Sequence, residues 1–400
     1  MRGGSKSSLP PSEQAGPRVM IVAGEASGDL HGANLARAIQ RERPEIRLSG
    51  MGGDELRAAG VEVLFDAARI AVVGVVEVLH HLGDVLRARK ILITEMKERR
   101  PALLILIDFP DFNLLLAAQA RKLGIPVLYY ISPQVWAWRS GRVKKIGRLA
   151  DRVATILPFE QAFYRRHGYR VDYVGHPLLD TVTTTMSRDG FLEKYDLPGD
   201  HPLIGIIPGS RRKEISTLLP IFLSAAERYQ AESSHPCTFL LPRASTVDQE
   251  LLLEHGAAQA KNSLDLRIID SDRYDLMAAC DGAIAASGTV TLELAILETP
   301  TVVAYRLAPL TYRLGRLLIR HLRFFSLVNL IAEQEIIPEL LQDEVTPGRL
   351  CRELQAVVDS EQRRKSMIAD FQRLKELLGS SGASSKTAAL VFEMLDAAGR

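Results

Sequence analysis

Short apolar runs alternate with helical patterns along almost the whole chain, and this alternation restricts the fold more than any other feature. The runs are apolar on both faces, as strands of a parallel sheet covered by helices on both sides must be. The 400 residues exceed what a single core usually organises. We therefore predict an α/β protein with two Rossmann-like, doubly wound domains. The predicted strands are Val19–Ala23, Leu103–Ile107, Val127–Ile131, Val153–Leu157 and Val171–Val174 in the first domain, and Leu203–Ile207, Thr238–Leu241, Leu266–Ile269, Ala283–Ala285 and Thr301–Ala304 in the second.

The segment between the two series of strands runs from Pro177 to Pro202, lacks a long apolar period and ends in glycine and proline. These features are typical of a linker. The chain is therefore predicted to divide into a flexible tail (1–17), a first domain (18–183), a second domain (184–346) and C-terminal helices (347–400) that pack back on the body.

Composition excludes several classes of protein. The 50 Lys and Arg residues nearly balance 48 Asp and Glu residues, so no overall field attracts a nucleic-acid backbone. The three cysteines, Cys237, Cys280 and Cys351, lie far apart and form no zinc motif or disulfide framework, which fits a reducing compartment. No apolar run reaches the roughly 18 residues needed to cross a bilayer, and the first 17 residues lack the apolar core of a signal peptide.

The first predicted strand leads into a glycine-rich loop, 24–32, whose backbone amides are candidates for binding a phosphate or a sugar hydroxyl. Glu25 and Ser27 are candidate substrate-binding residues here. Ser27 or Asp29 is expected to cap the helix that follows. The spacing is not that of a dinucleotide-binding loop, and a tight turn between a strand and a helix would also explain the glycines.

A second loop, Asp108–Asn113, follows the strand Leu103–Ile107 and carries two carboxylates beside a proline. A carboxylate held near an acceptor hydroxyl can take its proton, so this loop is a candidate for a general base. We favour Asp111 for this role, with Asp108 as the alternative. The competing interpretation is structural: Asp108 anchors the loop, while Asp111 or Asn113 caps the next helix.

Both tryptophans of the chain lie in the segment 131–139, directly before a basic run. Aromatic rings beside cations suit the faces of sugars or a phosphate, but they equally suit core packing next to a solvated basic face. The sequence leaves both interpretations open for these residues: Trp136, Trp138, Arg142, Lys144, Lys145 and Arg148.

In the second domain, two loops have the composition of an anion-binding site. Ser210 and Arg211 follow the strand Leu203–Ile207 and begin a helix, where amides and a guanidinium group together suit a diphosphate. The alternative is an ordinary surface arginine. No GxxxxGK[ST] pattern occurs, which argues against hydrolysis of a nucleoside triphosphate.

The other loop follows the strand Ala283–Ala285, where Ser287 is expected to cap a helix whose first amides are free to bind an anion. Gly288 and Thr289 belong to the same turn. Glu293 lies further along this helix and is a candidate for binding ribose hydroxyls, or else an acidic residue favoured by the helix dipole. No acidic pair or triad resembles a metal cage, so we expect transfer chemistry that needs neither a metal nor another cofactor.

Taken together, these segments resemble the lipid-A-disaccharide synthase family. The motifs that carry the resemblance occur in the family's order between about Val19 and Glu344, and nine in order are highly specific. They are GEASGDLHGANL, AVVGVVEVL, DFPDFN, SPQVWAWRSGRVKKI, LPFE, VGHPL, PGSRRKEI, ASGTVTLE and LVNLIAEQEIIPELLQDE.

The resemblance implies a GT-B fold, in which two Rossmann-like domains face a cleft. It also implies an inverting transfer of 2,3-diacylglucosamine from UDP to 2,3-diacylglucosamine 1-phosphate, which leaves UDP and the lipid A disaccharide 1-phosphate. By similarity, Asp111 is the base, and Arg211 and Asn329 are essential site residues. Ser287, Gly288, Thr289 and Glu293 are implied to surround the UDP. Local pattern alone does not single out Asn329.

The resemblance further implies a cytoplasmic protein attached to the inner face of the inner membrane, because both substrates carry acyl chains. The apolar segment Ile70–Leu82, followed by basic residues, is the predicted contact, and Tyr312–Arg323 is a second candidate. An ordinary core helix is the alternative for the first segment. A homodimer, another UDP-sugar enzyme of the same fold and a non-catalytic UDP-sugar-binding protein remain open at this point.

Overall fold

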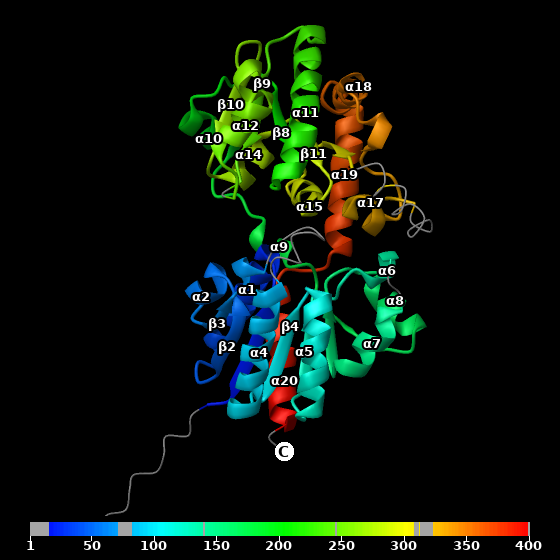
Figure 1. The fold of residues 1–400 in the computed structure, drawn as a ribbon. Helices are drawn as coiled ribbons and strands as arrows, with labels where there is room; N and C mark the ends of the chain where they lie inside the picture. Colours follow the sequence, from blue (N-terminus) through cyan, green and yellow to red (C-terminus); the bar gives the residue numbers. More distant parts are fainter. Residues whose placement is uncertain are drawn as a thin grey trace, which may run out of the picture. The chain divides into compact units, whose positions relative to one another are not determined.

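The computed structural model describes residues 16–70, 82–138, 141–244, 246–307, 312 and 323–398. They divide into two compact units, whose elements are labelled in Figure 1. Unit 1 consists of Met1–Ile156, Glu160–Val174 and Gly382–Arg400, and unit 2 of Leu157–Phe159 and Gly175–Ser381.

The described strands of unit 1 form one parallel sheet in the order β3-β2-β1-β4-β5-β6-β7. Their bounds are β1 Arg18–Ala23, β2 Arg47–Gly52, β3 Glu62–Asp66, β4 Leu103–Ile107, β5 Val127–Tyr130, β6 Arg152–Thr155 and β7 Asp172–Tyr173. The helices are α1 Ala26–Glu42, α2 Asp54–Ala58, α4 Leu82–Arg99, α5 Pro110–Lys122, α6 Val135–Trp138, α7 Arg142–Leu149, α8 Glu160–Arg166 and α20 Ala383–Ala398, with a 3₁₀ turn at Ala67–Arg69.

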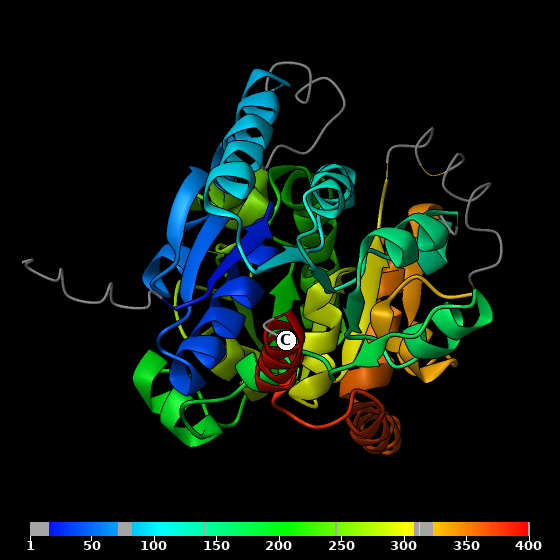
Figure 2. The same ribbon diagram turned by 90° about the horizontal axis from the view of Figure 1, so that it is seen from below.

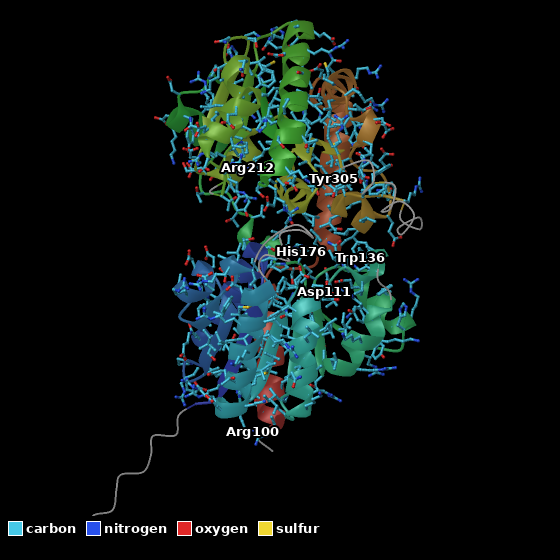
Figure 3. All side chains as sticks on the ribbon, viewed as in Figure 1. Arg100, Asp111, Trp136, His176, Arg212 and Tyr305 are labelled. Carbon is cyan, nitrogen blue, oxygen red and sulfur yellow. The ribbon has the colours of Figure 1, made fainter. Side chains whose placement is uncertain are left out.

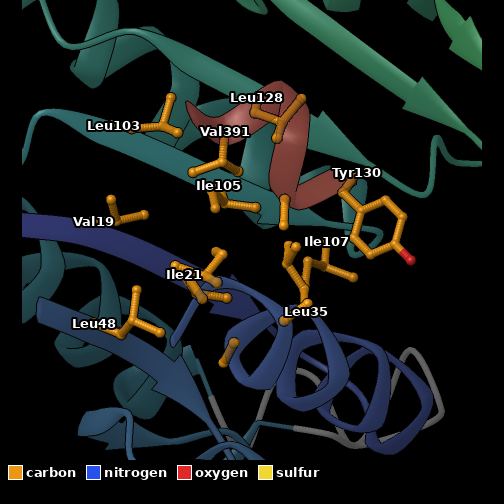
Figure 4. Packing of buried hydrophobic residues seen from close by; sticks show 14 of the residues in the cluster. Val19, Ile21, Leu35, Leu48, Leu103, Ile105, Ile107, Leu128, Tyr130 and Val391 are labelled. Atoms are coloured by element: carbon orange, nitrogen blue, oxygen red, sulfur yellow. The ribbon is translucent and has the colours of Figure 1, made fainter. Parts of the chain in front are cut away.

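Alternate residues of each central strand enter two different cores. Val19 and Ile21 of β1 pack with residues of α1 and α20 on one face, as Figure 4 shows, whereas Met20 and Val22 pack with α4, α5 and α7 on the other. Figures 1 and 2 both show α20 beside α1. The sheet is therefore covered on both faces, which confirms the doubly wound arrangement predicted from the apolar runs.

Three strands were absent from the sequence prediction: β2, β3 and β13. Strand β2 has the sequence RLSGMG, which lacks the usual enrichment in β-branched residues. Its Gly50 pairs with Ile21 of β1, and a Cβ atom at Gly50 would lie 1.8 Å from the Ile21 carbonyl oxygen. Position 50 requires glycine because Ile21, which is distant in sequence, leaves no room for a Cβ atom. The local composition alone therefore does not predict this strand.

The described strands of unit 2 form a second parallel sheet in the order β10-β9-β8-β11-β12-β13. Their bounds are β8 Leu203–Ile207, β9 Thr238–Pro242, β10 Asp265–Ile269, β11 Gly282–Ala286, β12 Thr301–Tyr305 and β13 Glu339–Leu341. The helices are α9 Leu178–Thr181, α10 Arg188–Tyr195, α11 Arg212–Glu232, α12 Gln249–Leu252, α13 Ala258–Ala260, α14 Arg273–Ala279, α15 Thr289–Ile296, α17 Leu327–Ala332, α18 Pro347–Val358 and α19 Glu361–Leu377, with short turns of other helix types at Leu253–Ala257 and Gln342–Glu344.

The boundary between the units differs from the one suggested by the sequence, which lay between residues 183 and 184. The structure changes unit at Val174 and Gly175. The segment taken as a linker contains α10, whose Phe191 is fully buried in the core of unit 2. Of the C-terminal helices, α18 and α19 belong to unit 2, whereas α20 belongs to unit 1.

Candidate active site

In unit 1, β2 lies next to β1 toward one edge of the sheet, whereas β5 lies next to β4 toward the opposite edge. The chain therefore leaves β1 and β4 in opposite directions. The carboxyl ends of β1 and β4 therefore form a topological switch point, which is where open α/β sheets bind ligands. The two loops at this point are the glycine-rich loop after β1 and the Asp108–Asn113 loop after β4. Figure 3 shows Asp111 and Trp136 at this end of unit 1 and Arg100 at the opposite end.

The glycine-rich loop presents backbone amides at the start of a long helix. Helix α1 begins at Ala26, and its N-cap residue is Glu25, whose side chain makes no capping hydrogen bond within the described structure. Glu25 and Ser27 are exposed. The expectation that Ser27 or Asp29 caps α1 was wrong. Instead, Asp29 is buried and accepts hydrogen bonds from the amides of residues 53, 55 and 56, which tie α2 to α1.

The second loop is strained at its first two residues. Asp108 and Phe109 have φ angles of 42° and 45°, in the left-handed region that costs non-glycine residues about 1–3 kcal/mol each. Tyr129 donates to the Asp108 carbonyl oxygen at 2.7 Å, and Asn113 donates to the same oxygen at 2.8 Å. The Phe109 ring lies so close to Gly24 that a Cβ atom there would be 2.3 Å from it. Neighbouring residues thus hold the loop in a conformation it would not adopt alone.

The two carboxylates of this loop have different surroundings. Partial burial and, to a smaller extent, the nearby Glu25 carboxylate raise the pKa of Asp108 to about 6, against the opposing effect of a hydrogen bond from the Phe109 amide. Asp111 lies in the first turn of α5, is 79% exposed at its side chain, and forms an ion pair with Arg142 of α7. Asp108 therefore combines partial burial with a raised pKa, whereas Asp111 is exposed and ion-paired.

The aromatic segment before α7 is only partly described. Trp136 is 9% exposed, and this burial favours the core-packing interpretation for its ring. Trp138 and Arg139 have side chains outside the described residues. Arg142 turns toward Asp111, while Lys144 and Lys145 are exposed on α7.

Unit 2 has its own switch point between β8 and β11, because the chain leaves these strands in opposite directions across the sheet. Gly209, after β8, has a φ of 101°, which favours glycine. Ser210 is exposed, and Arg211 is the N-cap residue of α11, where its side chain is 64% exposed and donates to Glu214 at 3.0 Å. Figure 3 shows Arg212, the first residue of α11, at this end of the sheet.

The loop after β11 differs from its predicted capping pattern. The N-cap residue of α15 is Gly288 and not Ser287, and no side-chain hydrogen bond caps α15 within the described structure. The amide of Ser287 instead donates to the Ala304 carbonyl of β12 at 3.0 Å. A Cβ atom built at Gly288 would meet no atom within 4 Å, and Thr289 is exposed. The first amides of α15 are therefore available to an anion.

Glu293 of α15 is 5% exposed and forms an ion pair with Arg273 of α14. Burial raises its pKa, while the charge and hydrogen bond of Arg273 and a hydrogen bond with Tyr274 lower it. The sequence analysis missed Arg273. The signal was present, since this arginine follows β10 at the same edge of the sheet as the predicted loops.

Asn329 of α17 is held by hydrogen bonds from its own side chain. It is fully buried, and its amide nitrogen donates to the Ile337 carbonyl at 2.9 Å and to Glu339 at 2.8 Å. Its amide oxygen accepts from the amides of Ile336 at 2.8 Å and Ile337 at 3.1 Å. Protein groups therefore occupy the whole amide, an arrangement typical of a residue that stabilises the local fold.

Two predicted surfaces fall largely outside the described residues. These are Ile70–Leu82 and Tyr312–Arg323. Of the helices in the described part of the chain, none combines the length and apolar character needed to cross a bilayer. Within those same residues, no group of three or more His, Cys, Asp or Glu side chains could hold a metal ion.

Comparison with protein families and curated sequences gives consistent results. The family model described as lipid-A-disaccharide synthetase matches residues 19–392. Lipid-A-disaccharide synthase of Geobacter sulfurreducens is 45% identical over 384 residues, covering 96% of this chain and 99% of the relative. The enzyme of the same name from Nitrosococcus oceani is 44% identical, covering 96% of this chain and 98% of the relative.

Solved structures share the architecture at low sequence identity. MurG of Acinetobacter baumannii superposes with a TM-score of 0.57 at 17% identity, covering 94% of this chain and 99% of that chain. UDP-GlcNAc 2-epimerase from Neisseria meningitidis, solved with UDP-GlcNAc bound, has a TM-score of 0.62 at 11% identity, covering 94% and 99%. The calicheamicin glycosyltransferase CalG4 has a TM-score of 0.60 at 14% identity, covering 95% and 98%. These similarities confirm the predicted GT-B fold class.

Proposed function

The chain belongs to the lipid-A-disaccharide synthetase family, and from this premise we propose how its residues carry out glycosyl transfer. The protein is a glycosyltransferase of lipid A disaccharide synthesis. Its substrates are a UDP-sugar and an acceptor. We propose that they are UDP-2,3-diacylglucosamine and 2,3-diacylglucosamine 1-phosphate. The match over nearly the whole chain disfavours both a different UDP-sugar enzyme and a non-catalytic binding protein.

In this proposal, Asp108 is the general base. The carboxylate takes the proton from the acceptor 6-hydroxyl as that oxygen bonds to C1 of the donor sugar. The bond from C1 to the UDP oxygen breaks on the opposite face, so UDP leaves with the electron pair and the configuration inverts. A base works best when its pKa lies near the operating pH, which favours Asp108 over the exposed and ion-paired Asp111. Glu25 and Ser27 then bind acceptor hydroxyls beside it.

Unit 2 supplies the groups that hold UDP. The uncapped first amides of α15, at Gly288 and Thr289, face the negative charge of the diphosphate, and Arg211 adds a guanidinium group from the loop after β8. The same groups stabilise the charge that develops on UDP as it leaves. Ser210 and Ser287 lie in the same two loops beside the diphosphate, and Glu293 accepts hydrogen bonds from the ribose hydroxyls.

The observation that carries the proposal is that the predicted substrate loops occupy the switch points of their sheets in both units. The test mixes the purified protein with both proposed substrates in the presence of a chelator and follows products by mass spectrometry. We expect a disaccharide phosphate and UDP in equal amounts. UDP binding without a disaccharide product would instead indicate another acceptor.

We also propose that the protein attaches peripherally to an anionic membrane surface, on the cytoplasmic side. The predicted contact, Ile70–Leu82, leads into the described part of α4. There, Leu86 is 54% exposed beside the exposed Arg87 and Lys90. An exposed apolar side chain among cations is typical of a helix that lies at a membrane interface.

Leu86→Glu is expected to weaken binding to vesicles that contain anionic phospholipid, because the change removes apolar contact and adds a repelled charge. The measurement is co-sedimentation with vesicles at low and high salt, and wild-type binding should fall as salt rises. Leu377→Glu is the matched control, since Leu377 is an exposed leucine of unit 2, at 47%. An equal loss of vesicle binding in both variants contradicts the proposed surface. Wild-type binding that does not change with salt concentration contradicts it as well.

A further inference from the structure

A buried carboxylate at the proposed UDP site is held by two adjacent residues that the proposed function does not yet use. The Glu293 side chain is 7% exposed, while Arg273 is 51% exposed at its side chain and pairs with it from α14. Tyr274, the next residue, also hydrogen-bonds the Glu293 carboxyl. The Arg273 guanidinium lies 4.9 Å from the centre of the Tyr274 ring, so the two partners also fix each other.

The position of Arg273 is set by the loop before it. Asp272 is the N-cap residue of α14 and has a φ of 54°, in the left-handed region. The hydroxyl of Tyr195 donates to the Asp272 carboxylate at 2.8 Å, and Lys194 pairs with the same group. Both residues belong to α10. The start of α14, and with it Arg273, is therefore anchored to a second helix.

We propose that Arg273 is a positioning residue for the UDP site, which keeps Glu293 ionised and oriented to accept hydroxyl groups of the nucleotide. A buried carboxylate without a partner takes up a proton, and a cation in contact with it opposes this. An ionised carboxylate has about four acceptor positions, of which Arg273 and Tyr274 occupy two. In this proposal, the hydroxyl groups of the nucleotide use the remainder. This inference rests on the proposed binding of UDP by unit 2.

Of the other elements that pack against α15, strand β11 and helix α17 carry no ionisable side chain, α9 carries Asp180 and β12 carries Tyr305. Helix α14 also carries the buried Asp275, whose carboxylate accepts hydrogen bonds from the amides of Thr185 and Met186. Helix α19 carries both acidic and basic residues, of which Lys375 pairs with Glu298 just beyond the C-terminal end of α15 and Arg373 pairs with Asp370. In the described part of unit 2, the main cationic influence on Glu293 is therefore Arg273.

The test compares the pH dependence of UDP binding, measured by calorimetry at a series of acidic, neutral and alkaline pH values. Arg273→Gln keeps hydrogen-bonding groups but removes the charge, so Glu293 should protonate at higher pH. We expect UDP binding about tenfold weaker at neutral pH, with recovery toward the wild-type value at alkaline pH. Arg273→Lys should restore most of the affinity. Glu293→Gln should bind weakly, without the pH-dependent recovery.

Arg267→Gln is the matched control, because Arg267 is a half-exposed arginine that pairs with Asp265 within β10, before the switch-point edge. Titration of the UDP phosphate is common to all these proteins and cancels in the comparison. Should Arg273→Gln fail to fold, Tyr274→Phe removes the other hydrogen bond to the carboxylate and should shift the profile in the same direction.

A loss of affinity that is equal at every pH would overturn the inference, because it indicates a structural effect or a direct contact with UDP. An unchanged profile would overturn it as well. In either case UDP still binds to the wild-type protein, so the proposed function is untouched. Absence of UDP binding by the wild-type protein at any pH contradicts the proposed function, and this inference with it.

Discussion

Asp108→Asn is expected to lower kcat by at least about 100-fold while UDP affinity stays within a factor of two or so, since a general base typically contributes 10²–10⁴ to the rate. The asparagine keeps the size and the hydrogen bond from the Phe109 amide but cannot take a proton. Because UDP is held by unit 2 in our proposal, its affinity does not depend on this side chain. Single-turnover kinetics and calorimetry with UDP give the two quantities.

Asp111→Asn is the matched control, because it makes the same chemical change one helical turn away. It breaks the ion pair with Arg142 at an exposed position, so we expect a several-fold effect at most. The reverse order, with Asp111→Asn inactive and Asp108→Asn active, contradicts our assignment and restores the one favoured from the sequence.

The pH profile gives an independent check on the same residue. A base must be deprotonated to act, so kcat/KM of the wild-type enzyme should fall as the pH drops through about 6, the pKa of Asp108. The residual kcat/KM of Asp108→Asn should not show this decrease at low pH.

Stability should change in the opposite direction from activity. The folded pKa of Asp108 is raised, so the folded state binds the proton more tightly than the unfolded state, and stability is lost as pH rises from about 4 to about 6. The asparagine variant does not suffer this loss. Its Tm should therefore exceed that of the wild-type protein at pH 7, and the difference should vanish near pH 4.

Asn329→Leu is expected to destabilise the protein by about 3–5 kcal/mol, which places it among the most damaging single changes. Leucine has the same branching and the same number of non-hydrogen atoms but provides no hydrogen bonds. The buried amides of Ile336 and Ile337 lose their acceptor, and the Ile337 carbonyl and Glu339 lose a donor. Each such buried group left unpaired costs about 1–3 kcal/mol, with partial relief by relaxation. Thermal and denaturant unfolding measure the effect.

The exposed Asn262 provides the control, since Asn262→Leu should change stability by no more than about 0.5 kcal/mol. The comparison also separates the two interpretations of Asn329. A direct catalytic role predicts a stable but inactive Asn329→Leu variant, whereas a structural role predicts loss of stability and activity together. A variant as stable as the wild-type protein would therefore contradict our interpretation.

The sequence by itself determined the fold class and where the chemistry lies along the chain. Strands buried on both faces must be apolar throughout, so runs such as Leu103–Ile107 were recognisable without any partner. The loop residues that follow such runs lie at the carboxyl edge of the sheet, and Asp108, Arg211 and Gly288 follow directly from that rule. The order of the motifs then identified the family, which the comparisons confirm.

Tertiary structure alone decided the roles that depend on partners distant in sequence. Asp29 looked like a cap of its own helix but accepts hydrogen bonds from amides at the start of α2, and the amide of Asn329 is fully engaged by Ile336, Ile337 and Glu339. Our proposal of Asp108 over Asp111 as the base rests on partial burial, on Glu25 and on Arg142, none of which the DFPDFN motif contains. Apolar periodicity is a local property, so sequence reveals it. Hydrogen bonds and charge environments arise between segments that only folding brings together, so they had to be found in the structure.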